Sequence, residues 1–227
     1  MSTRKNTLYN MAYRVFSILL PLATAPYLAR TVGQAGVGLY SYAWSLNYVC
    51  CLVAMLGLEN YGVRAIAQAR DDQAALNRTF SSIWRMQRAV AGAALALWLL
   101  YALLLAGEER SISLALTPAC AACLCNLDWC LMGLDRFRPI ALRNTAVKLL
   151  AALCVFLFVR SAGDLWIYGL AWGGATLIGA VSCALSLRPL VHVVPVSRQE
   201  ALCHLKPCAR CCSWRCWPSA CTARWTR

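Results

Sequence analysis

Long apolar runs separated by short charged turns dominate this chain of 227 residues. Each run is about 20 residues long, which is the length that an α-helix needs to cross a hydrocarbon layer roughly 30 Å thick. The runs lack the alternating pattern of barrel strands, and only helices or closed barrels satisfy the backbone inside lipid. We therefore predict an all-α, polytopic membrane protein with six transmembrane helices that form one bundle. The six runs are 8–29, 37–58, 89–107, 112–133, 140–159 and 165–187.

The stretch 127–139 shows how two runs are joined. It closes the fourth run, which we expect to be one helix across 112–133, and it opens the fifth. Asp128 and Trp129 lie where a carboxylate and an amphipathic ring reach the headgroup layer. Pro139 suits the first turn of the next helix, because its missing N–H costs nothing there. The chain repeats this plan of apolar run, charged turn and apolar run.

The composition agrees with a membrane chain and limits its partners. Hydrophobic residues make up 60% of the chain and charged residues 14%, against about 25% charged in an ordinary soluble domain. The net charge of +13 invites a nucleic-acid partner, but the positions of the cations argue against one. With the N-terminus in the cytoplasm, thirteen Lys and Arg residues of the turns and flanks lie inside and three lie outside. This asymmetry is typical of membrane proteins, whose inner loops meet anionic lipid.

The fourteen cysteines and two histidines do not form a recognisable catalytic or metal site. Cys120, Cys123 and Cys125 have spacing that resembles a metal site, but they lie in an apolar run without a nearby histidine. We interpret them as small packing residues. His192 and His204 lie outside the runs and have no partner at diagnostic spacing. With no Walker motif either, we predict a protein that is not an enzyme and holds no cofactor or metal.

Ionisable residues close to the runs are the candidates for a functional site. Arg14 either extends its side chain to the cytoplasmic face or faces a polar cavity. Glu59, between the expected helix breaks at Gly57 and Gly62, is either a site residue or the ion-pair partner of Arg64. Two further candidates are Lys148, in the cytoplasmic half of the fifth run, and Asp128, its possible partner.

The segment 64–88 joins the second and third runs. Its turn at Asp71 and Asp72 is followed by a basic face that includes Arg85 and Arg88. A basic amphipathic helix of this kind is typical of a segment that lies on a membrane surface. We predict that it lies on the inner leaflet before the third span.

Several motifs occur in a recognisable order along the chain. The earlier ones are Asn10, Pro21, Pro-Tyr-Leu-Ala-Arg at 26–30, Gly33, Gly36, Gly38 and Tyr40, and Leu-Gly-Leu-Glu-Asn-Tyr-Gly-Val-Arg-Ala-Ile-Ala at 56–67. The later ones are Asp-Trp and Gly-Leu-Asp-Arg-Phe within 128–137, with Arg143 and Lys148 downstream, and His-Leu-Lys-Pro at 204–207. Together, in this order, they resemble the bacterial polysaccharide flippases, which are the O-antigen and exopolysaccharide exporters of the multidrug/oligosaccharidyl-lipid/polysaccharide superfamily.

The resemblance implies transport of undecaprenyl-diphosphate-linked oligosaccharides across the bacterial inner membrane by alternating access, for polysaccharide biosynthesis. Such proteins have twelve or more helices in two bundles around a polar cavity, where cations meet the diphosphate and acidic sugars. Arg14, Arg64, Arg88 and Lys148 are the nearest matches here. The resemblance also allows coupling to H⁺ or Na⁺, contact with membrane lipids, and polymerase or assembly partners. A drug or solute antiporter of the same fold and an inert truncated fragment remain as alternatives.

The last twenty residues, 208–227, differ from the bundle predicted for 1–207, because Cys, Trp and Arg dominate them. A zinc cluster and a basic interfacial tail are two interpretations. We favour a third, a shifted reading frame. Cys and Trp codons begin with TG, so the frame that starts one base earlier reads Leu, Met or Val before each of them, as a seventh membrane helix requires. We therefore expect a disordered or weakly helical tail without a site, and a chain that does not transport alone.

Overall fold

A computed structural model describes residues 24–197 continuously, and positions 11, 15, 19, 22, 200, 203 and 204 singly; the side chains of 137–139, 141 and 162 are not described. In this part of the chain the regular secondary structure is helical throughout. The predicted tail at 208–227 and Arg14 lie outside the described residues. The elements, after helical residues 24–31, are α2 (Gly33–Met55), α3 (Leu58–Ala69), α4 (Gln73–Leu100), a π-turn η1 (Tyr101–Leu105), α5 (Arg110–Ala122), α6 (Asp128–Gly133), α7 (Phe137–Phe158), a 3₁₀ turn η2 (Ala162–Asp164) and α8 (Leu165–Leu187).

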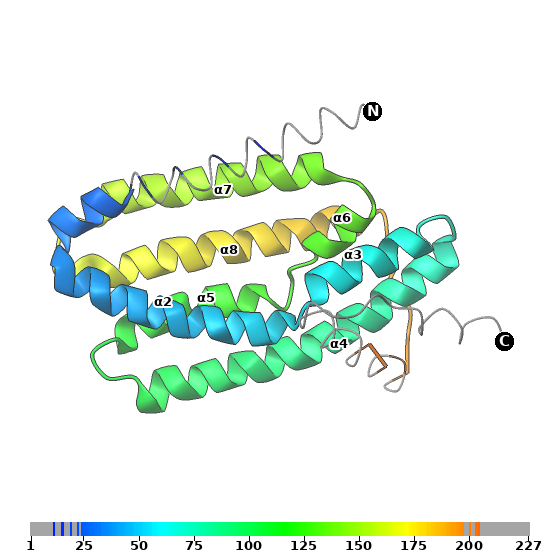
Figure 1. Ribbon diagram of the computed structural model, residues 1–227, viewed down its shortest axis with the longest axis horizontal. Coiled ribbons are helices and arrows are strands. Elements are labelled where there is room, and N and C mark those ends of the chain that lie inside the picture. The colour runs from blue at the N-terminus through cyan, green and yellow to red at the C-terminus, as the bar shows by residue number, and fades with distance from the viewer. Residues whose placement is uncertain are drawn as a thin grey trace.

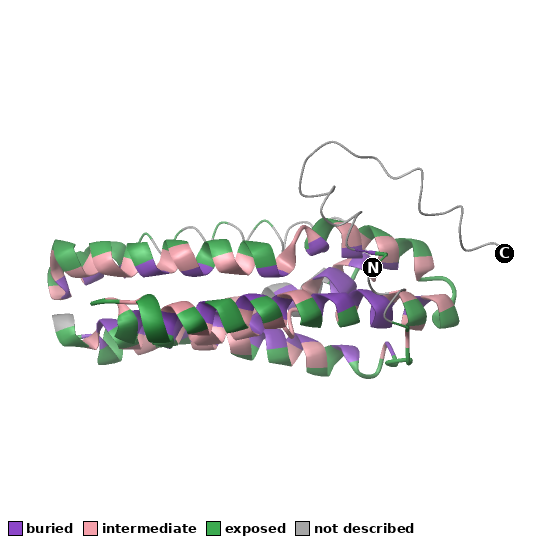
Figure 2. Cartoon of the chain, turned by 90° about the horizontal axis from the view of Figure 1, so that it is seen from below, coloured by how far each residue is buried: buried purple, intermediate pink, exposed green. Residues whose placement is uncertain are grey.

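The long helices lie side by side along the longest axis of the molecule (Figure 1). Helix α8 packs against both α5 and α7, and α2 packs against α4 and α5. The short helices α3 and α6 pack together at one end. Buried residues lie between the helices and exposed residues along their outer faces (Figure 2). The architecture is therefore an elongated helical assembly whose short helices gather at one end.

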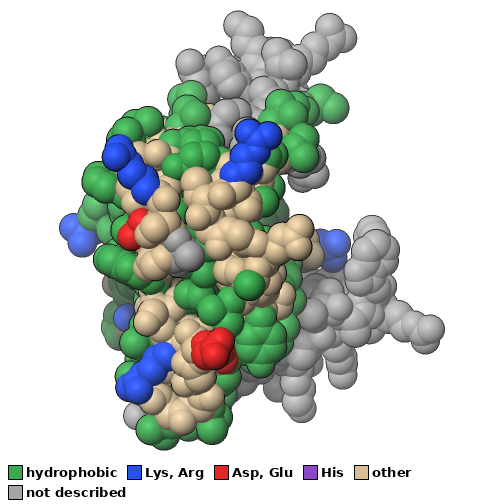
Figure 3. Space-filling model, turned by 90° about the vertical axis from the view of Figure 1, so that its left-hand side faces the viewer, with side chains coloured by type: hydrophobic (Ala, Val, Ile, Leu, Met, Phe, Trp, Pro, Cys, Tyr) green, Lys and Arg blue, Asp and Glu red, His purple; other side chains and the backbone are tan. Residues whose placement is uncertain are grey.

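Large apolar side chains on the outer faces indicate where lipid contacts the protein. Leu104 is 72% exposed and Leu105 is 74% exposed, and apolar side chains also cover much of the end that Figure 3 shows, with a few charged side chains among them. Gly33–Ala69, Gln73–Leu105 and Leu165–Leu187 are long and apolar enough to cross a membrane. The prediction of an all-α membrane protein is confirmed, while the number of six spans stays a prediction.

The fourth run is divided, contrary to the expected single helix across 112–133. Helix α5 ends at Ala122 and α6 begins at Asp128. Between them the chain closes tighter turns, in which Leu124 N–H donates to the Ala121 carbonyl at 3.1 Å. Apolar character continues across the break, so hydropathy alone could not show it. The physical cause is a buried side chain of α4 that binds the freed carbonyl groups, as described below.

The segment 64–88 does not form a helix of its own: it contains the end of α3 and the first half of α4, and its position on the inner leaflet stays a prediction. The break between α2 and α3 lies at Leu56 and Gly57, which have φ angles of 43° and 72°. The predicted turn at Asp71 and Asp72 is confirmed, and Asp72 Oδ1 caps α4 by accepting from Ala74 N–H at 2.9 Å. From there α4 continues without a break into the third apolar run, because no glycine or proline interrupts its first half.

Glycine lets α3 and α6 approach each other closely. Gly62 was expected to break the helix, but it lies inside α3 and the helix continues through it. A Cβ atom there would lie 2.6 Å from a ring carbon of Trp129, and one at Gly133 would lie 2.7 Å from Ile66 Cβ and 2.9 Å from the Val63 carbonyl oxygen. These contacts are shorter than packed atoms tolerate. The α3–α6 interface therefore depends on the missing side chains at Gly62 and Gly133.

We expect Gly133→Ala to lower the stability of the protein. Overpacking a filled interface costs about 1–3 kcal/mol, and Gly133 is the last residue of α6, where alanine gains less than the roughly 1 kcal/mol that it gains in a helix interior. Gly92→Ala is the matched control, because a Cβ atom there meets nothing within 4 Å. Thermal denaturation in lipid nanodiscs, followed by tryptophan fluorescence, measures both variants. Equal melting temperatures for the two variants would contradict the packing described here.

Candidate functional site

Two of the predicted site residues, Asp128 and Lys148, line one cavity. Asp128 begins α6 and Lys148 lies in the middle of α7. The cavity has a volume of about 190 Å³ and also takes lining residues from α5 and α8. This volume lies below the roughly 300–1,000 Å³ of pockets that enclose a small molecule. It can therefore receive one charged group of a larger ligand. Its other polar lining residues include Asn126, Arg143, Asn144 and Thr176.

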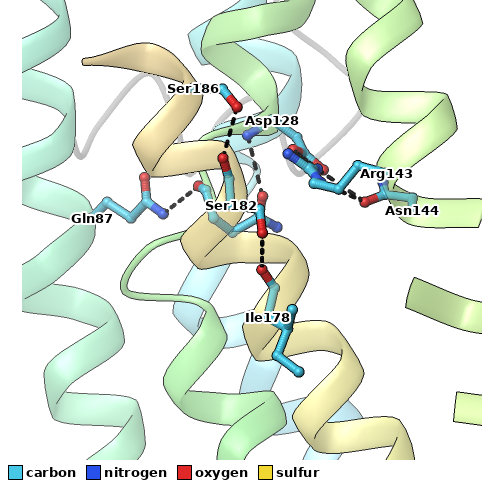
Figure 4. A network of polar contacts seen from close by, with 8 residues as sticks. Gln87, Asp128, Arg143, Asn144, Ile178, Ser182 and Ser186 are labelled. Carbon is cyan, nitrogen blue, oxygen red and sulfur yellow. Dashed lines mark hydrogen bonds and ion pairs between the residues drawn. The ribbon is translucent and has the colours of Figure 1, made fainter. Parts of the chain in front are cut away.

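The centre of this cavity is an ion pair between Asp128 and Arg143. Arg143 Nη2 lies 2.7 Å from Asp128 Oδ1, and the two side chains are only 14% and 22% exposed, in the order Arg143 and Asp128. Arg143 also donates from Nε and Nη2 to Asn144 Oδ1, at 3.1 and 2.9 Å (Figure 4). The predicted partner of Asp128 was Lys148. The structure shows Arg143 paired with Asp128, and Lys148 lines the same cavity five residues further along α7.

The position of Asp128 follows from a buried amide on α4. Gln87 is 0% exposed, and its Nε2 donates to the carbonyls of Cys123 and Asn126 at 2.7 and 2.8 Å. Its Oε1 accepts from Trp129 Nε1 at 3.0 Å. Gln87 thus satisfies carbonyl groups at the break between α5 and α6 (Figure 4). A carboxylate in the first turn of α6 is also favoured by the helix dipole, so Asp128 is held where Arg143 reaches it.

The other candidates that the structure describes, Glu59, Arg64 and Arg88, are not among the residues that line this cavity. Glu59 and Arg64 are exposed on α3, and they form no ion pair with each other among the described residues. Glu59 is near enough to Asp128 for their carboxylates to interact electrostatically. Arg88 is exposed on α4, with its guanidinium carbon 4.1 Å from the centre of the Trp84 ring. Neither Arg64 nor Arg88 lines the cavity.

Sequence reasoning did not select Gln87 or assign a site role to Arg143. Gln87 stands between Arg85 and Arg88, in a stretch whose polar residues predicted a membrane-surface face. One signal was available for Arg143, since it is a cation four residues into a run that begins at Ile140. A charge at that depth needs a partner. The pairing of Arg143 with Asp128 is therefore the main addition that the structure makes to the candidate site.

A half-buried ion pair with a second cation nearby, set among apolar helices, is typical of membrane transport proteins. The chain belongs to a family of this class. A family model described as "Polysaccharide biosynthesis protein" matches residues 3–201. The resemblance to polysaccharide and O-antigen flippases that the motifs predicted is thereby confirmed.

A curated relative from Escherichia coli (strain K12) carries the description "Putative O-antigen transporter". The two proteins are 24% identical over 197 residues, which are 85% of this chain and 46% of the relative. The chain thus spans about half the length of this relative. No solved structure matches the chain significantly.

Proposed function

We propose that this chain forms one lobe of an inner-membrane flippase for lipid-linked oligosaccharides, in which the Asp128–Arg143 pair and Lys148 receive the anionic part of the substrate. The observation that carries this proposal is the cavity lined by these three charged side chains. Their formal charges sum to +1 when all three are ionised. A net positive cavity favours a diphosphate or an acidic sugar and disfavours the cationic dyes that drug antiporters export.

The ion pair suggests how the site takes up and releases an anion. Arg143 is bound to Asp128 at 2.7 Å, so its charge is balanced while the site is free. A diphosphate oxygen offers Arg143 a second acceptor of the kind that guanidinium binds well. Exchange of the carboxylate for the diphosphate leaves Asp128 free to take up H⁺ or Na⁺. This exchange would couple substrate binding to an ion.

The family membership and the description of the relative as an O-antigen transporter support this substrate class. The resemblance implies that such flippases move undecaprenyl-diphosphate-linked repeat units across the inner membrane. Alternating access requires two bundles that move against each other. The chain spans 46% of its relative, so we assign it the role of one of those bundles. We expect it not to transport without a second lobe.

We expect Arg143→Gln and Lys148→Gln, introduced into the gene in a bacterium that also supplies the second lobe, to lower surface polysaccharide severalfold and to accumulate the lipid-linked precursor. The reason is that each substitution removes a charge that the anion needs. Gel analysis of surface polysaccharide and mass spectrometry of the precursor measure the effect, with immunoblots for protein level. Arg110→Gln is the control, since it makes the same change at the exposed start of α5.

Unchanged polysaccharide in both cavity variants, at normal protein levels, would remove these cations from the mechanism. Unchanged polysaccharide after deletion of the whole gene, together with lost efflux of a cationic dye, would instead favour an antiporter. The two outcomes are distinct, so the experiment separates the role of the site from the function of the protein.

A further inference from the structure

The segment that follows α8 lies in register along one face of α4. We call residues 190–196 of this segment the strap. The residues of α4 that bind the strap recur every four positions, and the bound residues of the strap recur every two. Four residues of helix rise roughly 6.0 Å and two residues of extended chain advance roughly 6.6 Å, so the two periods match. Gln73 Nε2 donates to the Leu190 carbonyl at 3.1 Å, His192 N–H donates to Asn77 Oδ1 at 3.0 Å, Val194 N–H donates to Ser81 Oγ at 2.9 Å, and Arg85 Nη1 donates to the Val196 carbonyl.

The strap contributes only main-chain groups to these four bonds. Pro195 fits the pattern, because none of the bonds needs an N–H at that position. Apolar packing anchors the start of the strap, where Val191 is 5% exposed and shares one core cluster with Leu187 of α8 and with Leu76 and Phe80 of α4. Helix α8 otherwise packs mainly on α5 and α7. The strap, which Figure 1 shows in orange beyond α8, therefore adds a connection from the end of α8 to the first half of α4.

Helix α8 is fixed a second time, in its first half, by close packing on α5. A Cβ atom at Gly173 would lie 3.2 Å from the Ala115 carbonyl oxygen and 3.3 Å from the Ala119 nitrogen, so the two backbones are in contact there. Between this contact and the strap lie four of the residues that line the cavity of the candidate site, which are Ala175, Thr176, Gly179 and Ala180. One wall of the cavity is thus a stretch of helix held at two points.

The helix that binds the strap also holds the opposite wall of the cavity. Gln87 lies two positions beyond Arg85, the last residue of α4 that binds the strap. It donates to the carbonyls of Cys123 and Asn126 at 2.7 and 2.8 Å, and both of these residues line the cavity. The two walls are therefore connected through α4, on one side by the strap and on the other by Gln87.

We propose that the strap is a positioning element that sets the width of this cavity, because it holds the end of α8 on the helix that also holds the opposite wall. Asn144 shows how near the α8 wall lies to the ion pair. Its Oδ1 accepts from Arg143 Nη2 at 2.9 Å and would lie 3.6 Å from a Cβ atom at Gly179. Without the strap, α8 is free to swing about its contact at Gly173, and the wall moves relative to Asn144.

Asn77 and Ser81 are then positioning residues, since they act on the cavity through the strap and do not line it. The effect on an anion in the cavity rests on the function proposed above. The position of α8 does not, so the strap is tested by a distance and by a binding measurement.

The distance measurement compares two valines of the strap. Val194→Pro removes the N–H that binds Ser81, whereas Val193→Pro removes an N–H for which the described part of the chain shows no acceptor. Spin labels on genetically encoded amino acids replace exposed Ala89 of α4 and exposed Leu185 of α8, and pulsed electron resonance in lipid nanodiscs measures the distance between them. We expect Val194→Pro to lengthen and broaden this distance, and Val193→Pro to leave it unchanged.

The binding measurement uses inorganic pyrophosphate as the probe, in the same nanodiscs and without labels. Asn77→Leu removes the acceptor of the His192 N–H, whereas Asn77→Asp keeps an oxygen that can accept this bond. We expect severalfold weaker pyrophosphate binding in Asn77→Leu and Val194→Pro, and wild-type binding in Asn77→Asp and Val193→Pro. Recovery in Asn77→Asp identifies the bond to the strap, rather than the polar side chain as such, as the cause.

Three results would overturn the proposal. These are equal distances in the two proline variants, wild-type pyrophosphate binding in Val194→Pro despite a changed distance, and binding in Asn77→Asp as weak as in Asn77→Leu. If Val194→Pro does not fold, the two Asn77 variants replace the proline variants in the distance measurement. A wild-type protein that binds no pyrophosphate would contradict the function proposed for the cavity, and the distances alone would then decide whether the strap positions α8.

Discussion

Replacing Asp128 by alanine is expected to destabilise the protein by about 3–5 kcal/mol, because it leaves the charge of Arg143 without its partner in a half-buried setting. Arg143 is 14% exposed and lies 2.7 Å from the carboxylate. Asn144 Oδ1 remains as an acceptor, but an amide oxygen cannot balance a full charge. Thermal or denaturant unfolding of the purified protein in nanodiscs measures the change.

Two controls within the chain make this prediction specific. Arg70→Ala breaks a pair with Asp135 of similar length, 3.0 Å, whose side chains are 49% and 70% exposed, in the order Arg70 and Asp135. An exposed pair of this kind contributes only about 0–1 kcal/mol. The double variant Asp128→Ala with Arg143→Met removes both charges and should recover most of the loss. If Asp128→Ala is no more harmful than Arg70→Ala, the pair is not buried as described.

Replacing Gln87 by leucine is expected to cost about 3 kcal/mol or more, since three buried polar groups lose their partner together. They are the carbonyls of Cys123 and Asn126 and the indole N–H of Trp129, and each buried group left without a hydrogen bond costs about 1–3 kcal/mol. Leucine fills a similar volume, so the loss reports hydrogen bonding rather than a cavity.

The same variant should also disturb the candidate site, because Gln87 fixes the break that places Asp128. Gln68→Leu, at an exposed position of α3, serves as the control for the change from amide to hydrocarbon. Unfolding measurements on both variants, together with surface polysaccharide in cells, should show loss in Gln87→Leu and little change in Gln68→Leu. Wild-type stability in Gln87→Leu would mean that the break between α5 and α6 does not depend on this amide.

The sequence predicted those features that local chemistry determines. Apolar runs of span length predicted the long helices, and the turn at Asp71–Asp72 and the break at Gly57 were predicted from residue type. It did not predict the division of the fourth run, because the bonds that stabilise the break join Gln87 to residues 36 and 39 positions away. Hydropathy averages over neighbours in the chain and carries no information on such distant partners.

The sequence predicted only part of the candidate site, because it shows which residues are charged but not which of them meet in the fold. Asp128 and Lys148 were selected because charges near apolar runs are rare, and the structure places both at one cavity. The pairing of Asp128 with Arg143 was not predicted, because it depends on which side of α7 faces α6. The hydrogen bonds that join α3 and α4 to residues after α8 were not predicted, because the partners lie more than a hundred positions apart in the chain. Tyr61 and His204, for example, are separated by 143 positions.

The central claim is that Arg143 and Lys148 bind the anionic group of a lipid-linked saccharide, and direct binding tests it. The protein in nanodiscs is titrated with undecaprenyl-diphosphate-linked oligosaccharide, and its tryptophan fluorescence or thermal stability is followed. The account predicts that the double variant Arg143→Gln with Lys148→Gln binds about tenfold or more weakly than the wild type, since loss of a charged partner costs about 2–5 kcal/mol, while Arg110→Gln binds as the wild type does. Equal affinity of the double variant and the wild type would contradict it.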